Sequence, residues 1–197
     1  MNKLHLFSLS FVIFLITILL AYEITLHTIT LTPTQQTTFN YLLHSEQIPS
    51  EYNSNEENHL KDVKSIMNKI PYILLTLTLI LATSIYYTLK KEKKNISTLF
   101  QGLSTASLIA MIGSLIFTIL SITLFPTLFT YFHTIFFPQG NWIFPQNSYI
   151  ITTFPEEFFQ NIALHIGITT ILLQLAAPIT NVLIKRKKCT ETNNHRL

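Results

Sequence analysis

The chain has 197 residues, of which 48% are hydrophobic and only 12% are charged. Its apolar residues are gathered in long runs, which is typical of a protein that crosses a bilayer and argues against a water-soluble globular core. The net charge of +3 is concentrated next to these runs, where helix orientation and contact with anionic headgroups explain it, so we expect no nucleic-acid partner. The single cysteine excludes an internal disulfide and a thiolate metal cluster.

Four apolar segments are long enough to cross about 30 Å of hydrocarbon as helices. They are residues 4–22, 71–89, 103–124 and 163–184. A cleaved signal peptide is the alternative for the first segment, but that segment is longer than the usual apolar region and lacks a small-x-small cleavage site, so we expect it to be retained. The sequence therefore predicts one domain, residues 1–197, with the fold class of an all-α integral membrane protein.

Lysine and arginine define the expected orientation of this domain. They cluster in "KKEKK" (90–94) and "KRKK" (185–188), whereas residues 95–184 contain neither. Cytoplasmic segments carry such an excess, which places both termini in the cytoplasm of a cell-membrane protein. The expected cytoplasmic parts are the loop 90–102 and the tail 185–197, and the expected outer segments are 23–70 and 125–162.

The first outer segment contains a predicted amphipathic helix over residues 55–69. Ser54 stands three residues before Glu57, which is a capping-box spacing, and Pro71 favours a helix end before it. His59 lies at the edge of the apolar stripe, with Glu56 and Asp62 each three residues away, so a carboxylate could hold one ring nitrogen and leave the other as a base. The alternative is a helix that only lies on the membrane surface.

The second outer segment is rich in aromatic residues and proline. Between residues 125 and 159 lie nine of the 15 phenylalanines, the only tryptophan and four of the eight prolines. The prolines should break up a continuous helix, and the apolar side chains favour a place in the membrane interface, as a roof or wall over a cavity. His133 stands among these aromatic residues, where burial favours its neutral form.

The fourth apolar segment has its own polar features. "TFPEEFF" (153–159) predicts a helix start, with Thr153 as the cap, Glu156 three residues later and a capping role favoured for the glutamate. His165, inside the segment, should face the bundle interior, either as a functional group or as an interhelical hydrogen-bond partner. In the third segment, small residues predict a packing seam: Ser107, Ala110, Ser114 and Thr118.

Two motifs in the outer segments carry a family resemblance. "E-x-x-H-L-x-D-V-K" spans 56–64, and "F-H-x-x-F-F" spans 132–137, followed by Trp142, Phe144 and "F-P-E-x-F-F" from Phe154. With four apolar segments in the same order and a basic tail, the chain resembles the bacterial lipoprotein intramolecular transacylase family, Lit, and the uncharacterised membrane proteins grouped with it.

The resemblance implies an enzyme that moves the sn-2 acyl chain of a diacylglyceryl-modified lipoprotein to the α-amino group of the same N-terminal cysteine. It implies that His59 and His133 are catalytic, at the outer leaflet, without a cofactor or metal. The expected partners are the diacylglyceryl lipoprotein and membrane lipids, and we expect a monomer. The expected supporting or substrate-binding residues are Glu56, Asp62, Lys64, Trp142, Glu156 and His165.

The two histidines should have different roles. We expect Glu56 or Asp62 to make His59 the more basic and therefore the base for the amine. His133 would then act on the ester. The other interpretations of the chain are a non-catalytic membrane protein that binds partners or acts as a chaperone, and a membrane protein with histidine-ligated haem.

Overall fold

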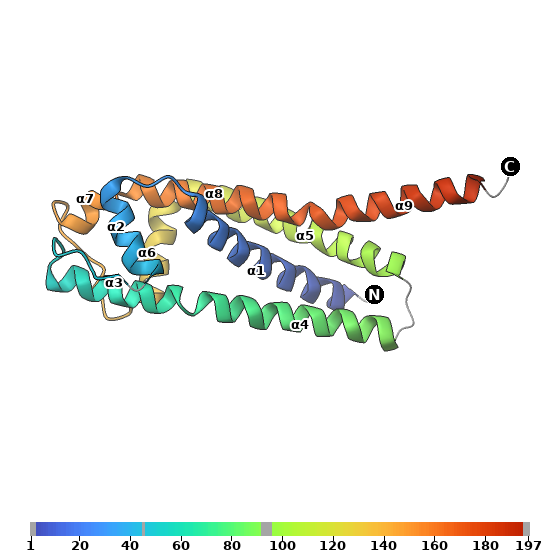
Figure 1. Cartoon of the computed structure of the whole chain (residues 1–197), viewed down its shortest axis with the longest axis horizontal. Helices are drawn as coiled ribbons and strands as arrows, with labels where there is room; N and C mark the ends of the chain where they lie inside the picture. The colour runs from blue at the N-terminus through green and yellow to red at the C-terminus, as the bar shows by residue number, and fades with distance from the viewer. Residues whose placement is uncertain (1–2, 45, 92–95, 195–197) are drawn as a thin grey trace.

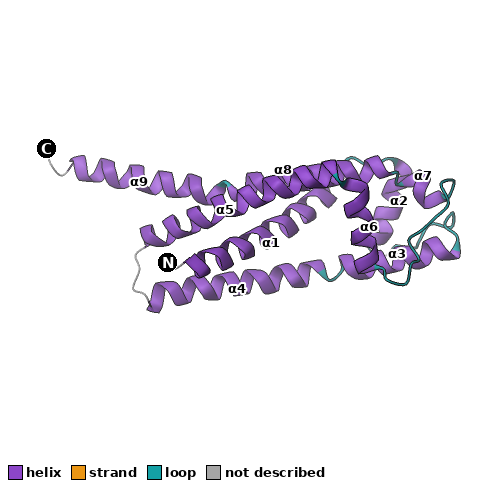
Figure 2. Cartoon of the chain, turned by 180° about the vertical axis from the view of Figure 1, so that it is seen from behind, coloured by secondary structure: helices purple, strands orange, loops and turns teal. Residues whose placement is uncertain are grey.

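Long apolar helices form the body of the molecule and short helices form a cap at one end (Figure 1). The computed structural model describes residues 3–44, 46–91 and 96–194, and within these residues every regular element is an α-helix (Figure 2). The body consists of α1 (Lys3–Thr28), α4 (Ile70–Lys91), α5 (Ile96–Thr123), and α8 (Glu156–Gln174) continued by α9 (Ala176–Asn194). Each of the four predicted membrane spans lies in a stretch of helix that is long and apolar enough to cross a membrane.

The helices extend beyond the apolar runs that predicted them. α1 continues through Thr28 rather than ending at residue 22, and much of the expected cytoplasmic tail is helical, since α9 reaches Asn194. A helix does not stop at the edge of the hydrocarbon, so hydropathy marks only the part inside it. Of the expected loop 90–102, residues 92–95 lie outside the described part of the chain, and α5 already begins at Ile96.

Small residues on α5 let the central helices approach closely. Ser107, Ala110, Ser114 and Thr118 are all buried, as the predicted packing seam requires. Opposite them on α8, a Cβ at Gly167 would collide with the Thr118 side chain. Contact at this seam therefore depends on the absence of a side chain at one position.

A buried glutamine ties three helices together in the middle of the bundle. The Gln174 amide, 1% exposed, donates to Thr17 Oγ1 of α1 at 2.9 Å and to Ser114 Oγ of α5 at 2.9 Å. The helix breaks directly after it, between α8 and α9, because Pro178 cannot donate a hydrogen bond to the Gln174 carbonyl. An amide at this depth must find partners, so it fixes the register of α8 against its neighbours.

The cap consists of α2 (Pro33–Leu43), α3 (Ser54–Met67), α6 (Phe125–Phe136) and α7 (Tyr149–Thr153). It lies at the opposite end of the bundle from the start of α1 and the start of α5, and α6 crosses the bundle direction toward α3 (Figures 1 and 2). The core of the cap is a cluster drawn from four helices and two loops. Its buried members are Leu26, Phe39, Leu42, Tyr52, Leu60, Ile150 and Phe154.

Three local expectations differ from the structure. α3 is capped one residue earlier than predicted, by Asn53 with Glu56 at the third helical position. The predicted cap of α8 is wrong, because Thr153 ends α7 and Pro155 is the residue before α8, without a side-chain cap. α6 is a regular helix inside the proline-rich segment, since Pro126 lies in its first turn, where a missing N–H costs nothing.

Candidate active site

His59 of α3 and His133 of α6 lie side by side in the cap. Their ring centroids are 5.9 Å apart and their planes are inclined by 30°. Both side chains are buried, with exposed fractions of 6% and 8%. The structure therefore brings together two histidines that are 74 residues apart in the sequence (133 minus 59).

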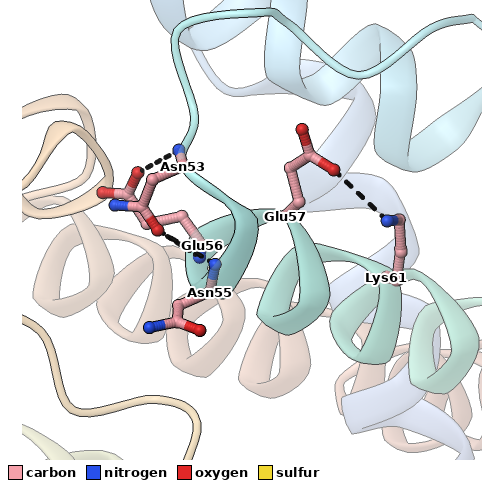
Figure 3. Close-up of polar contacts among 5 residues, drawn as sticks. All are labelled: Asn53, Asn55, Glu56, Glu57 and Lys61. Atoms are coloured by element: carbon pink, nitrogen blue, oxygen red, sulfur yellow. Dashed lines mark hydrogen bonds and ion pairs between the residues drawn. The ribbon is translucent and has the colours of Figure 1, made fainter.

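The first turn of α3 fixes the place of His59. The Asn53 side chain accepts the N–H groups of Asn55 and Glu56, and the Glu56 carboxylate accepts the Asn53 N–H at 2.8 Å (Figure 3). The other Glu56 oxygen accepts the Ile150 N–H at 3.0 Å. Both oxygens of Glu56 thus bind backbone amides, so this carboxylate serves the scaffold and does not hold the imidazole.

On its exposed side, α3 carries an ordinary surface ion pair. Lys61 Nζ lies 3.3 Å from Glu57 Oε2 (Figure 3). Pairs with this spacing on an exposed helix face contribute little to stability. The buried side of α3 is the side that carries Glu56 and His59.

His133 is held by the backbone of its own helix. Its Nδ1 lies 2.8 Å from the Phe129 carbonyl oxygen, which can only accept, so Nδ1 carries the hydrogen. In a neutral imidazole this leaves Nε2 with a free lone pair. The turn before His133 therefore sets the tautomer that can act as a base.

Aromatic rings surround both histidines. His59 lies with its ring centroid 4.7 Å from that of Phe137 and 5.6 Å from that of Phe144. His133 lies 4.1 Å from Phe129 and 4.9 Å from Trp142. These rings remove water from the pair and give the surroundings an apolar character suited to lipid.

Burial keeps both imidazoles neutral. The pKa of His59 is lowered to about 4, chiefly by burial and also by the neighbouring His133, whereas Asp62 and the Asn141 side chain act in the opposite direction. Burial also lowers the pKa of His133, against the effect of the Phe129 carbonyl. Asp62 raises the pKa of His59, as expected of a nearby carboxylate, but desolvation outweighs this effect and the net shift is downward.

The hydrogen bonds of the Asp62 carboxylate join α3 to the loop after α6. Its Oδ2 accepts the side-chain amides of Gln139 at 2.8 Å and Asn141 at 2.7 Å. Neither amide residue was predicted as a site residue. The sequence feature that indicates this turn is Gly140, which lies between the two amides. Its φ of 76° lets both neighbours turn toward α3.

Lys64 belongs to the scaffold. Its ammonium group donates to the carbonyl oxygens of Tyr41 and His44, at the end of α2, and lies 4.2 Å from the centre of the Tyr41 ring. These contacts close the C-terminal end of α2 and join it to α3.

Two further predicted residues lie apart from the pair. Glu156 is exposed at the start of α8 and accepts a hydrogen bond from Gln160. His165 is also exposed, and its Nδ1 bonds the Asn161 carbonyl of its own helix at 2.8 Å. The prediction that His165 faces the bundle interior is wrong, because the free lipid-facing side of α8 accommodates a ring whose hydrogen bond is satisfied locally.

The described part of the chain contains no group of three His, Cys, Asp or Glu side chains close enough to share a metal ion. A cavity of about 270 Å³ lies at the other end of the bundle, among the start of α1, the end of α4 and the start of α5. It is far along the long axis from the cap that holds the histidines (Figure 1). The histidine pair is therefore the candidate active site.

Comparison with known proteins identifies a family and a similar fold. A family model described as lipoprotein intramolecular transacylase Lit matches residues 31–159, which include both histidines. The fold is similar to the structure of the membrane-integral lipoprotein intramolecular transacylase Lit from Bacillus cereus, with 23% identity, a TM-score of 0.73, and coverage of 95% of this chain and 97% of that chain.

Two variant structures of that Bacillus cereus protein, each with one histidine replaced, give the same likeness. The arginine variant has a TM-score of 0.72 at 21% identity and covers 96% of this chain and 94% of that one. The alanine variant has a TM-score of 0.72 at 21% identity and covers 95% of each chain. No curated protein sequence matches the chain.

Proposed function

Because the chain belongs to the lipoprotein intramolecular transacylase family, Lit, it is a membrane enzyme that transfers an acyl chain within a lipoprotein, and we propose that His59 and His133 perform this transfer. The observation that carries the proposal is the stacked, buried histidine pair, with ring centroids 5.9 Å apart. The pair lies inside the region matched by the family, and both members come from one chain. The site is thus complete in a monomer, which we propose as the active unit.

The reaction moves one acyl group and one proton. The α-amino group of the N-terminal cysteine attacks the sn-2 ester carbonyl of the diacylglyceryl group. The carbon–oxygen bond to glycerol breaks, a carbon–nitrogen bond forms, and the proton lost by the amine reaches the glyceryl oxygen. An α-amino group has a pKa of about 8 and must be neutral to attack, so a base near it increases the rate.

His133 is the better placed base. The Phe129 carbonyl holds the hydrogen on Nδ1 and leaves the Nε2 lone pair available. This reverses the expected roles of the two histidines. The fixed tautomer needs no rearrangement before His133 accepts the proton of the amine.

His59 is then the acid that delivers the proton to the leaving oxygen. A pKa of about 4 means that His59 is neutral at rest and that, once protonated by way of His133, it gives up the proton readily. Like charges at this separation oppose each other, so only one of the two imidazoles carries an additional proton at a time. One proton is all that the transfer requires.

The aromatic surroundings favour the amine over water as the group that receives the acyl chain. Phe137, Phe144 and Trp142 contact the two imidazoles and exclude water from them. Water would compete with the amine and release a fatty acid. Apolar surroundings favour contact with the acyl chain and leave the tethered amine as the favoured nucleophile.

The same site suggests the orientation in the membrane. The cap with the histidines and the helix ends next to the lysine-rich segments lie at opposite ends of the bundle (Figure 1). The positive-inside bias supports cytoplasmic termini, with the histidine pair at the outer leaflet. There it would meet lipoproteins after their export, among the lipids of that leaflet.

The deciding experiment is mass spectrometry of a lipoprotein N-terminus from an ester-lipid bacterial host that lacks enzymes of this family. Expression of this chain should convert the diacylglyceryl form to the N-acyl, S-monoacylglyceryl form. His133→Ala should abolish the conversion, and His165→Ala, a histidine outside the site, should retain it. Full conversion by His133→Ala would refute its role, and no conversion by the unchanged protein would favour a protein that only binds partners.

A further inference from the structure

The loop after α6 is tied to α3 by two amides that share one carboxylate oxygen. Gln139 Nε2 and Asn141 Nδ2 both donate to Asp62 Oδ2, at 2.8 and 2.7 Å. The turn begins at Phe137, whose carbonyl accepts the Gly140 N–H at 3.0 Å. Both amides come from this turn, but Asn141 is the one that acts on a histidine of the pair.

Asp62 fixes the orientation of the Asn141 amide. A carboxylate only accepts hydrogen bonds, so the nitrogen of the amide must face Asp62 and the oxygen must face away from it. Asn141 Oδ1 is buried and makes no hydrogen bond of standard geometry within the described residues. The same is true of His59 Nδ1.

These two atoms are complementary. The Asn141 oxygen only accepts, and the His59 nitrogen can donate. The Asn141 side chain raises the pKa of His59, which is the direction expected of an acceptor next to the ring. Catalytic hydrogen bonds are often long in a resting site and tighten when the substrate is bound.

We propose that Asn141 is the positioning residue of His59: its side-chain oxygen accepts the hydrogen on Nδ1, and Asp62 holds the amide in the orientation that makes this possible. The proposal rests on the proposed function of the histidine pair and adds the group that orients the second histidine. The Phe129 carbonyl holds Nδ1 of His133, and Asn141 holds Nδ1 of His59. Both Nε2 atoms are then left for the one proton that the reaction moves.

The arrangement also supports His59 in its transient charged form. When His59 carries the proton, both ring nitrogens donate, and Asn141 Oδ1 satisfies the one that faces away from the reaction. The charge of Asp62 polarises the amide between them. The groups that act on His59 are therefore Asp62, Asn141 and His133, and all three influence its protonation.

The test uses full-length protein in lipid nanodiscs, labelled with ¹⁵N-histidine, and a synthetic diacylglyceryl lipopeptide. Three variants are compared: Asn141→Leu removes the acceptor with little change in volume, Asn141→Asp keeps an acceptor and adds charge, and Gln139→Leu removes the other amide on Asp62. Thermal unfolding of each variant verifies that it is folded. The readouts are kcat, KM, and the ¹⁵N shifts of His59 during a pH titration.

Asn141→Leu should lower kcat by roughly ten- to a hundredfold, with a small effect on KM, and should lower the pKa of His59 and mix its tautomers. Asn141→Asp should raise that pKa, and Gln139→Leu should leave it unchanged. An unchanged His59 titration in Asn141→Leu overturns the proposal, as does an equal loss in Gln139→Leu. If Asn141→Leu does not fold, an unchanged titration in Asn141→Asp has the same consequence.

The titration separates this proposal from the function on which it rests. If the unchanged protein does not convert the lipopeptide, the transacylase function of the pair fails. The ¹⁵N shifts still report whether Asn141 holds His59, because they need no substrate.

Discussion

The Glu56 carboxylate accepts the backbone N–H of Ile150 at 3.0 Å and thereby joins the first turn of α3 to the first turn of α7. Its exposed fraction is 1%. The second oxygen caps α3 at Asn53. One side chain thus fixes the height of α3 in the cap and, one turn later, the place of His59.

Replacement of this carboxylate should destabilise the cap. Glu56→Ala leaves the N–H groups of Asn53 and Ile150 without acceptors, at a cost of about 3 kcal/mol for two charge-assisted hydrogen bonds. Glu56→Gln should cost less, because its amide oxygen can still accept one of them. Thermal unfolding in detergent measures both, and equal melting temperatures for Glu56→Ala and the unchanged protein would contradict the assignment.

The histidine pair should behave as one unit in kinetics. His59→Ala and His133→Ala should each reduce kcat by roughly 10²- to 10⁴-fold. The double variant should lose little more than the worse single variant, because removing either member already interrupts the path of the proton. Losses that multiply in the double variant would show that the two histidines act independently.

The buried His59 should make the protein less stable in mild acid. The unfolded chain takes up a proton at His59 near its ordinary pKa of 6.5, whereas the folded chain does so only at about 4. The free energy of unfolding is therefore unaffected by His59 above roughly pH 6.5. It decreases as the pH falls toward about 4, by up to about 3 kcal/mol from this residue.

This dependence can be tested by melting curves at roughly pH 7.5 and roughly pH 5. His59→Leu should show a smaller difference between the two melting temperatures than the unchanged protein. His165→Leu, which removes an exposed histidine, should keep the full difference. Equal pH dependence in the His59 variant would show that this imidazole is not the destabilising group.

The close contact between α5 and α8 gives a matched pair of glycine substitutions. Gly167→Ala places a methyl group against Thr118 and should lower the melting temperature, by about 1–3 kcal/mol in stability. Gly113→Ala has open space around it and should be neutral or slightly stabilising, because alanine favours a helix. Thr118→Ala should rescue Gly167→Ala, and absence of rescue would place the strain elsewhere.

The proposed orientation can be tested by cysteine labelling. Single cysteines at the exposed cap positions Ser50 and Gln139, in a background with Cys189→Ser, should react with an impermeant maleimide added to intact cells. A cysteine at Lys187 should react only after the cells are opened. The reverse pattern would place the histidine pair in the cytoplasm, where exported lipoproteins cannot reach it.

The sequence by itself determined the membrane class, the four spans and the helix that carries His59. Hydropathy and helix capping act between near neighbours, so they can be read from short segments such as 54–67. The two histidine motifs also indicated the family that the comparisons confirm. The competing interpretations as a haem protein or a partner-binding protein had no comparable support in the residues.

Only the tertiary structure decided what these residues do to one another. The stacking of His59 on His133, the amide of Asn141 between Asp62 and the pair, and the outward position of His165 all depend on contacts between distant segments. The basicity of His59 is the clearest case. Its neighbours in the sequence are acidic, yet the aromatic rings of Phe137 and Phe144 remove water from it, and desolvation outweighs a charge that is already engaged in other hydrogen bonds.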